Sequence, residues 1–355
     1  GDCKMKAYIH IGTPKTGTTE IQSFFVKNYQ ELLNIGICYP KSFRLANKHW
    51  RLAEIISYIV DNNLRTNDVI NTINQTKFKD SLADLQAEIQ QNQDKIFLFS
   101  AEDIVWEFST LKHIEIFKQM LFELGFDDIK IVIYLRDTLK YLISFCSEDV
   151  KHYKGFYSFE MLPQEHPKKH IFDYKWLCQS YAQVFGVKNL FVKLFEKSKM
   201  YENNLLKDFA KLIGISWSEK FILPSYINQS FNLLGIEIQK RLNEHLLENK
   251  NFNSLLRITK KHFENTSNER LKYIPQREVL RNYYNYFKES NEWVRINYFP
   301  NEKIIFSSTP DDFKSNFELK NINEKDLDDI VAYILEIVKN KDDVINNLKN
   351  SINLS

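Results

Sequence analysis

The chain lacks several features that mark large classes of protein. Its 355 residues contain four cysteines, and no two of them have a C-x-x-C spacing, which argues against a zinc site (Cys3, Cys38, Cys146 and Cys178). No apolar run approaches the roughly 18 residues that a transmembrane helix needs. The formal net charge is only +2, so composition indicates neither a nucleic-acid partner nor a membrane surface. We find no internal repeat and no low-complexity linker.

A secretory signal peptide is also missing from the start of the sequence. Residues 1–4 precede Met5, which would make a natural start, and we leave them out of the fold. Free thiols are the expectation for a reducing compartment, so we predict a cytoplasmic location.

Four apolar segments predict β-strands, at residues 6–11, 95–100, 129–135 and 189–195. Helical periodicity lies between them, at residues 18–34, 51–61, 78–92, 110–124, 138–151 and 174–185. Strands with little alternation, separated by helices, are typical of a parallel sheet that is covered on both faces. The sequence therefore predicts an α/β fold with a central parallel sheet flanked by helices.

The pattern changes after Pro224. Residues 235–290 are helical in periodicity and rich in charge, residues 297–306 favour strand or loop, and residues 324–350 predict one or two surface helices. We expect one domain over residues 5–320, with 235–290 as an added helical subregion. Residues 321–355 are then a C-terminal helical extension.

The stretch YIHIGTPKTGTTEIQ, residues 8–22, resembles a Walker A loop with its lysine displaced. Gly12 and Gly17 have the right spacing, and Thr19 stands where a Ser or Thr belongs. Thr18 occupies the usual lysine position, and the only lysine of the loop is Lys15. A strand, a glycine loop and a helix in this order point backbone N–H groups at one spot and favour a phosphate there.

The other residues of the loop support phosphate binding. Pro14 stiffens the turn, and Thr16, Thr18 and Thr19 add hydroxyl donors. A tight strand-to-helix turn would explain the glycines but not the threonines and the lysine. A lysine inside the loop can stabilise the charge of a leaving oxygen, a task that Mg²⁺ shares in nucleotide triphosphatases. We therefore expect no metal.

The segment TPKTGTT resembles the 5′-phosphosulfate-binding loop of sulfotransferases, which use 3′-phosphoadenosine 5′-phosphosulfate (PAPS) as donor. The segment IVIYLRDTLKYLISF resembles their 3′-phosphate motif, with Arg136 at the end of a strand and Ser144 eight residues later. Weaker similarities to the bacterial branch lie in GICYP and NKHWRLA, in VFGVKNLFVKLFEK and LLKDFAKLIGI, and in NEWVRINYFP. The resemblance covers most of residues 6–306 and implies a P-loop-like sulfotransferase fold.

Both residues of the second motif make physical sense as ligands of a phosphate. Arg136 ends a strand, at the edge where open α/β sheets bind ligands, and its guanidinium can fork onto phosphate oxygens. Ser144 lies about two helical turns further on. The alternative is that Arg136 pairs with Asp137 or another acid while Ser144 is a small buried residue of an apolar helix.

Sulfuryl transfer to a hydroxyl needs a general base, and two residues are candidates. Glu102 follows a predicted strand and should lie at the same sheet edge as Lys15 and Arg136. His49, in NKHWRLA, has the pKa suited to a base at neutral pH, although it also fits a surface histidine that opens a helix. The family uses Glu or His, according to the branch. Asp103 competes with Glu102, and the order of these two stays open.

Weaker candidates lie further along the chain. In NEWVR, Trp293 could stack on adenine and Arg295 could bind the 3′-phosphate, although Trp293 fits a core residue equally well. Asn228 and Ser230 lie on a polar turn that could approach the cleft.

The resemblance implies a bacterial, cytoplasmic sulfotransferase whose acceptor is a hydroxyl of a carbohydrate, a glycolipid or a surface-polysaccharide precursor. Residues 235–290 would then form part of the acceptor wall. No nucleic-acid partner and no membrane span are expected, and peripheral membrane contact stays open. Two other interpretations remain: a P-loop kinase or NTPase, and a catalytically silent nucleotide-binding protein.

Overall fold

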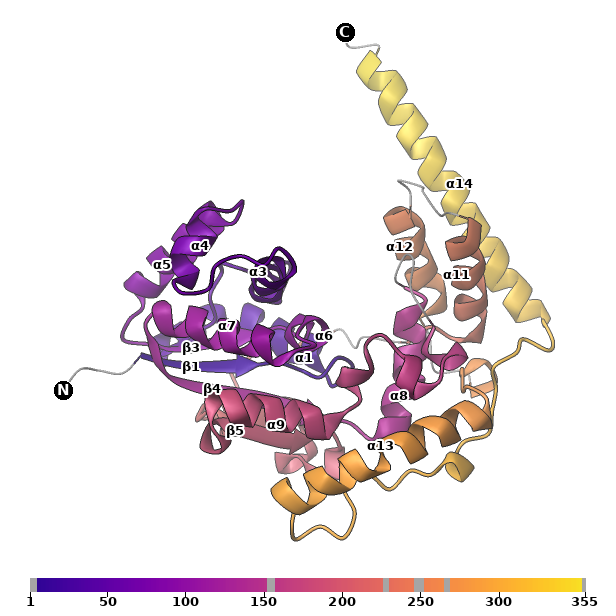
Figure 1. Cartoon of the computed structure of the whole chain (residues 1–355). Helices are drawn as coiled ribbons and strands as arrows, with labels where there is room; N and C mark the ends of the chain where they lie inside the picture. Colours follow the sequence, from indigo (N-terminus) through magenta and orange to yellow (C-terminus); the bar gives the residue numbers. More distant parts are fainter. Residues whose placement is uncertain (1–4, 152–156, 226–229, 246–251, 265–268, 353–355) are drawn as a thin grey trace. The chain divides into compact units, whose positions relative to one another are not determined.

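The computed structural model describes residues 5–151, 157–225, 230–245, 252–264 and 269–352 (Figure 1). In this part of the chain five strands form one sheet, ordered β2–β3–β1–β4–β5, and every neighbouring pair is parallel. The strands are β1 (Met5–His10), β2 (Ile37–Cys38), β3 (Ile96–Ser100), β4 (Phe126–Leu135) and β5 (Leu190–Leu194). The predicted α/β class with a parallel sheet is confirmed. Only β2 was missed, because two residues leave no pattern to detect.

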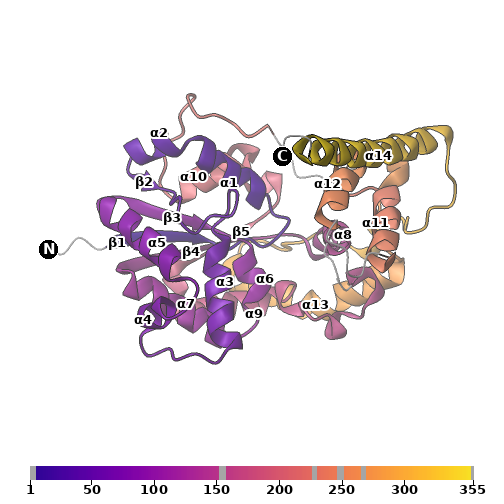
Figure 2. The ribbon, with the colours of Figure 1, turned by 90° about the horizontal axis from the view of Figure 1, so that it is seen from above.

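Helices cover both faces of this sheet. Figure 2 shows α1 (Thr18–Lys27) and α10 (Leu205–Leu212) on one face, and α7 (Leu111–Glu123) and α9 (Tyr174–Phe185) on the other. Shorter or more peripheral helices complete the layers: α2 (Tyr29–Asn34), α3 (Trp50–Asp61), α4 (Val69–Asn74), α5 (Lys79–Gln91) and α6 (Asp103–Glu107). The two-faced covering explains why the strands are continuous apolar runs.

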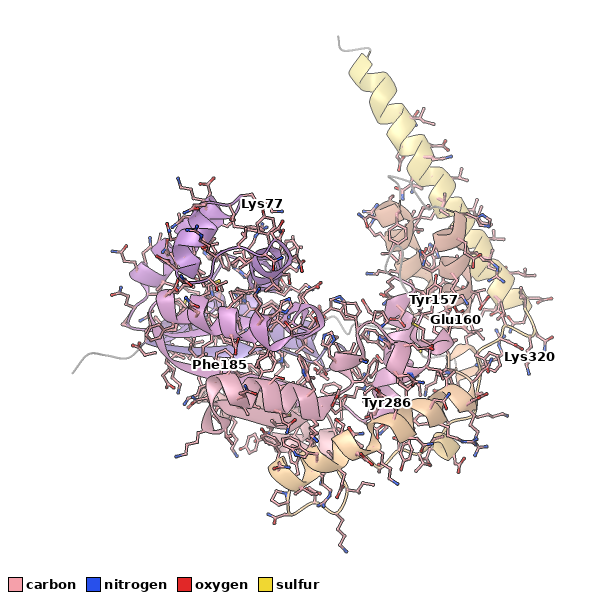
Figure 3. The ribbon with its side chains drawn as sticks, in the orientation of Figure 1. Lys77, Tyr157, Glu160, Phe185, Tyr286 and Lys320 are labelled. Carbon is pink, nitrogen blue, oxygen red and sulfur yellow. The ribbon has the colours of Figure 1, made fainter. Side chains whose placement is uncertain are left out.

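Each face has its own apolar core. On the α1 face, Phe24 and Phe25 pack with Leu98 and Tyr134 of the strands and Phe209 of α10 in a single cluster. On the opposite face Phe185, labelled in Figure 3, lies at the end of α9 with its ring centroid 6.3 Å from that of Phe117 in α7. The sheet is therefore held between two helical layers, which fixes the positions of its strand ends.

The chain divides into two compact units. The first comprises residues 1–138, 167–228 and 287–307, and contains the sheet. The second comprises residues 139–166, 229–286 and 308–355. It holds most of α8 (Thr138–Asp149), α11 (Leu233–His245), α12 (Phe252–Phe263), the first part of α13 (Arg277–Tyr298) and α14 (Glu324–Ile352). A single domain over residues 5–320 stays a prediction. The two compact units alternate along the sequence, and neither has a boundary at residue 320.

Aromatic and ionic contacts tie the second unit together. Tyr333 of α14 packs on Phe263 of α12 at 5.3 Å between ring centroids. Lys240 of α11 forms an ion pair with Glu160 at 2.7 Å and lies over the ring of Tyr157; the two partners are labelled in Figure 3. The tail is one helix, and residues 299–306 form a loop without a strand. No helix in the described residues combines the length and apolar character needed to cross a membrane.

Candidate active site

The glycine loop is anchored to the middle of the sheet. Beyond β1 the chain still pairs with β4, since the Ile11 N–H donates to the Val132 carbonyl at 3.0 Å and the Thr13 N–H to the Tyr134 carbonyl at 3.1 Å. In return the Tyr134 N–H donates to the Gly12 carbonyl at 2.7 Å. The loop therefore leaves the sheet only after Thr13 and reaches α1 within four residues.

Two glycines are required by the geometry of this loop. Gly17, at the start of α1, has φ 75°, and a Cβ there would lie 2.2 Å from Leu205 Cδ2 and 3.1 Å from the Phe195 ring. Gly12 has φ 97°, and a Cβ there would lie 3.1 Å from the Cβ of Glu102. A side chain at either position would meet both backbone strain and a neighbour. The second distance also places Glu102 directly against the loop.

The threonines of the loop have different tasks. The Thr13 hydroxyl donates to the Tyr134 carbonyl at 3.2 Å, and the Thr16 hydroxyl donates to the Thr13 carbonyl. Both side chains are fully buried, so these hydroxyls brace the loop itself. Thr18 and Thr19 begin α1, whose N-cap Gly17 supplies no side-chain cap. The amide groups and dipole of that helix end favour an anion.

Arg136 is brought to the same loop. It follows the last residue of β4, and its Nη1 donates to the carbonyl of Lys15 at 2.8 Å. The guanidinium carbon lies 5.6 Å from the centre of the Phe195 ring, and the Arg136 carbonyl accepts from the Tyr174 hydroxyl at 2.7 Å. The two cationic residues predicted to hold the donor therefore come from neighbouring points of one sheet edge.

Glu102 lies where β3 ends and α6 begins. One carboxylate oxygen, Oε2, accepts from Gln22 Nε2 at 2.7 Å, and the other lies 3.3 Å from Lys48 Nζ. Lys48 also pairs with Asp103 at 2.7 Å. Burial and the neighbouring Glu102 charge raise the pKa of Asp103, and Lys48 opposes both effects. One lysine thus joins two adjacent carboxylates beside the loop.

His49 lies close in sequence but is fully buried. The Ser100 N–H donates to its Nδ1 at 3.0 Å, so the proton is on Nε2, which donates to the Pro40 carbonyl at 2.9 Å. Burial lowers the pKa of His49 to about 3. The ring is therefore neutral with both nitrogens engaged. The alternative of a surface histidine is wrong, although His49 does open α3.

The remaining predicted ligands are not gathered at this edge by the described contacts. Ser144 lies in α8, within the second compact unit, so its part in a 3′-phosphate site stays a prediction. Arg295 donates to the Glu292 carboxylate at 2.8 and 2.9 Å and to the Glu302 carbonyl at 2.8 Å. Trp293 packs at a tilt against Tyr298, at 6.2 Å between ring centroids. Asn228 lies outside the described residues.

Sequence reasoning missed two residues of this corner, Gln22 and Lys48. Gln22 lies on the buried face of α1 and is only 3% exposed, so a polar residue at an apolar position of the helical pattern was the available signal. Lys48 sits beside His49 in a charged stretch and carried no such signal. Among the described residues, no group of three or more His, Cys, Asp or Glu side chains could hold a metal ion.

Comparisons with known proteins give structural neighbours only. No family model and no curated protein matches the chain. A sulfotransferase from Alicyclobacillus acidocaldarius is similar with a TM-score of 0.37 and 14% identity, over 69% of this chain and 96% of that one. The sulfotransferase domain of the Synechococcus PCC 7002 olefin synthase has a TM-score of 0.35 and 14% identity, over 81% of this chain and 96% of that one. The sulfotransferase domain of the curacin biosynthetic pathway has a TM-score of 0.34 and 10% identity, over 64% of this chain and 80% of that one.

Proposed function

We propose that the chain transfers the sulfuryl group of PAPS to a hydroxyl of an acceptor. The observation that carries the proposal is the convergence of three predicted residues on one loop. Arg136 bonds the Lys15 carbonyl at 2.8 Å, and Glu102 lies against Gly12, with 3.1 Å between its Cβ and the position of an added Cβ. Two cations for a doubly phosphorylated donor and one carboxylate for a proton thus lie at a single sheet edge.

The donor would bind with its 5′-phosphosulfate at the loop and the N-terminus of α1. There the Lys15 ammonium is suited to stabilise the charge that develops on the leaving phosphate oxygen. Arg136, at the end of β4, is suited to bind the 3′-phosphate, which PAPS carries and ATP lacks. The hydrogen bond from Arg136 to the Lys15 carbonyl ties the arginine to the loop before the donor arrives.

Glu102 is the proposed general base. The acceptor oxygen attacks sulfur, the bond from sulfur to the phosphate oxygen breaks, and the acceptor proton passes to the carboxylate. A carboxylate can accept about four hydrogen bonds, so the contacts with Gln22 and Lys48 leave acceptor sites for the proton. His49 is less suited, because its Nδ1 accepts from Ser100 and its pKa is lowered to about 3.

The finer parts of the proposal rest on the sequence resemblance. They are a carbohydrate, glycolipid or surface-polysaccharide acceptor, a cytoplasmic location, and a part for residues 235–290 in the acceptor wall. The described helices of that region, α11 and α12, show that its helical character was predicted correctly. Its contact with an acceptor stays a prediction.

Donor binding tests the proposal most directly. Calorimetry in a chelating buffer should show that PAPS and its product, adenosine 3′,5′-bisphosphate, bind without a divalent metal, while ATP binds far more weakly. A strict need for Mg²⁺, or equal affinity for ATP, would support a kinase or NTPase instead. Binding of the bisphosphate with no sulfated product from PAPS across a mass-spectrometric acceptor screen would support the catalytically silent alternative.

Two substitutions separate the roles of the cations. Lys15→Ala should lower kcat strongly, because the leaving-group charge develops only in the transition state. Arg136→Ala should mainly weaken donor binding, by about 1.5–3 kcal/mol or roughly ten- to hundred-fold. An unchanged PAPS dissociation constant in Arg136→Ala would reject its assignment to the 3′-phosphate.

A further inference from the structure

Gln22 is a polar residue on the buried face of α1. It lies among the apolar residues that pack on the sheet, namely Ile21, Phe24 and Phe25, and is 3% exposed. A glutamine side chain in such a position loses hydration and rotational freedom, so its presence requires compensating hydrogen bonds. It makes two described bonds, and one of them reaches the proposed base: Nε2 donates to Glu102 Oε2 at 2.7 Å and to Ser100 Oγ at 3.3 Å.

We propose that Gln22 is a positioning residue, which holds the Glu102 carboxylate in the orientation needed to take the acceptor proton. This inference rests on the proposed function, since it takes Glu102 as the general base. The observation behind it is that Gln22 and Glu102 both come from elements next to the glycine loop. Gln22 lies on the helix that follows the loop, and Glu102 lies at the end of the strand beside it.

The second contact of the amide, with Ser100, is buried. Ser100 Oγ lies 2.8 Å from Nδ1 of His10, the last residue of β1. Burial lowers the pKa of His10 to about 3, so the ring is neutral. The oxygens of the Glu102 carboxylate can only accept, so the contact at 2.7 Å requires the nitrogen end of the Gln22 amide to face Glu102. The Ser100 hydroxyl can accept from the same nitrogen, at 3.3 Å.

The two oxygens of Glu102 consequently meet donors of different kinds. Lys48 is a flexible ammonium whose side chain is 29% exposed, at 3.3 Å from Oε1. Gln22 is buried and stays neutral at every pH, and its Nε2 lies closer to the carboxylate, at 2.7 Å from Oε2. A buried donor at 2.7 Å restricts the carboxylate more than an exposed one at 3.3 Å does. The orientation of Glu102 is therefore expected to depend mainly on Gln22.

The chain offers a matched control in Gln119. Its Nε2 donates to Glu123 Oε1 at 2.7 Å within α7, the same chemical contact at the same distance. The other oxygen of Glu123 accepts from the Ile70 N–H at 2.7 Å, far from the glycine loop in sequence. Gln119→Met thus removes an equivalent hydrogen bond that has no place in the proposed reaction.

The first test compares Gln22→Met with Gln119→Met. With PAPS and the acceptor found in the screen, Gln22→Met should lower kcat by about ten- to a hundred-fold, since misplacement by about 1 Å costs up to that order. Its affinity for adenosine 3′,5′-bisphosphate should stay within about twofold of the parent value, which also shows that the loop is folded. Gln119→Met should leave kcat near the parent value.

A second variant reports on the contact through pH. In Gln22→Glu, the introduced carboxyl can donate to Glu102 as the amide does while it is protonated, whereas it repels Glu102 once it is ionised. This variant should regain turnover relative to Gln22→Met at acid pH and lose it as pH rises, a fall that the parent protein lacks. A merely structural role for Gln22 would not create this new alkaline limb.

A third measurement needs no acceptor. In protein labelled with ¹⁵N only at glutamine side chains, the amide signal of Gln22 is identified as the one that disappears in Gln22→Met, and it should shift with pH in the parent chain. That shift should vanish in Glu102→Gln, whereas the signal of Gln119, which disappears in Gln119→Met, should keep its own response. If no glutamine signal responds to Glu102→Gln, the contact does not exist in solution and the inference fails.

The outcomes distinguish this inference from the function on which it rests. If Glu102→Gln loses turnover but Gln22→Met behaves like Gln119→Met, the positioning role is rejected and the proposed base stands. If Glu102→Gln keeps full turnover, the base assignment is rejected, whatever Gln22 does. If PAPS fails to bind, the proposed function falls, and the amide signal still decides whether Gln22 holds Glu102.

Discussion

Each compact unit contains a lysine placed between two carboxylates, and the two clusters differ in what surrounds them. In the sheet unit Lys48 lies 3.3 Å from Glu102 and 2.7 Å from Asp103, and the three side chains are 19–29% exposed. In the helical unit Lys151 lies 2.6 Å from Glu264 and 3.5 Å from Glu148. The Lys151 and Glu264 side chains are only 4% and 8% exposed. We call them the Lys48 cluster and the Lys151 cluster.

Because their surroundings differ, two clusters with the same combination of charges are expected to have different roles. Lys151 is closed in by packing and lies over the Phe231 ring at 4.9 Å, so its closest ion pair is shielded from water and loss of one charge leaves the other buried. The Lys48 cluster is partly open, lies against the glycine loop, and includes a carboxylate held by a second donor, Gln22. We therefore expect the Lys151 cluster to govern stability and the Lys48 cluster to govern activity.

The largest effect is expected from neutralising the carboxylate of each cluster. Glu102→Gln should reduce kcat by roughly 10²- to 10⁴-fold with nearly unchanged donor affinity, because it removes the proton acceptor. Glu264→Gln should leave kcat near the parent value while lowering the unfolding midpoint. Steady-state kinetics with PAPS, together with bisphosphate binding, checks both. Equal losses of kcat in the two variants would remove the distinction between the clusters.

The next largest effect is expected on stability, where the Lys151 cluster should matter more than the Lys48 cluster. Lys151→Met should lower the free energy of unfolding by about 3–5 kcal/mol, since it leaves Glu264 buried without the lysine. Lys48→Met should cost about 1 kcal/mol or less, because its pairs are partly exposed to solvent. Urea unfolding, followed separately in each unit by a local probe, measures both values. A larger loss from Lys48→Met would contradict the comparison.

A third prediction uses pH to test His49, the rival of Glu102 beside the Lys48 cluster. Its pKa is lowered from 6.5 to about 3 in the folded protein, so between these pH values the unfolded chain binds a proton at His49 and the folded chain does not. Stability is then intact above pH 6.5 and falls as pH drops from 6.5 toward 3, by about 3 kcal/mol at pH 4. In His49→Asn, whose Oδ1 can still accept from the Ser100 N–H, this part of the loss should be absent.

The same variant decides the catalytic question. If turnover with the true acceptor keeps its dependence on pH in His49→Asn, the base is not His49. A limb of the pH profile that vanishes only in this variant would transfer the role of base from Glu102 to His49. If Glu102→Gln and His49→Asn both keep near-parent turnover, neither residue takes the proton.

The smallest expected effect is the response to salt. Raising the ionic strength to about 1 M shortens the screening length to about 3 Å, which weakens exposed pairs far more than buried ones. The cost of Lys48→Met should therefore shrink by a few tenths of a kcal/mol, while that of Lys151→Met should not change. Repeating the unfolding series at low and high salt measures this. Equal sensitivity would mean that the Lys151 pair is open to solvent.

Much of the fold could be predicted because its signals are local. The strand at 96–100 is an apolar run, and the strand predicted at 129–135 is the mainly apolar part of β4, which begins three residues earlier at Phe126. The helices α3, α5, α7 and α9 lie within one or two residues of their predicted ranges. The region predicted as one helix from residue 18 to 34 is two helices, α1 and α2, divided at Asn28. Its side chain accepts from the Ile222 N–H at 2.7 Å, a contact between residues 194 positions apart that no local pattern contains.

The candidate site was predictable only in part, for the same reason. Lys15, Gly12, Gly17 and Arg136 are recognisable from spacing, because a loop and a strand end determine their places. As candidate bases, Glu102 was favoured by its position after a strand and His49 by its ordinary pKa, and the sequence left the choice open. Their difference lies in burial and partners: His49 is enclosed by Pro40 and Ser100, while Glu102 lies partly open against Gly12.

By itself the sequence determined the parallel sheet, the helices that cover it and the glycine loop that ends β1, since these follow from short-range periodicity and from the backbone needs of glycine. Only the tertiary structure decided which polar residues meet. It placed Gln22 on Glu102, set Lys48 between Glu102 and Asp103, and buried His49. Contacts between residues far apart in the chain depend on how the strands are ordered in the sheet, and the pKa of each group depends on those contacts.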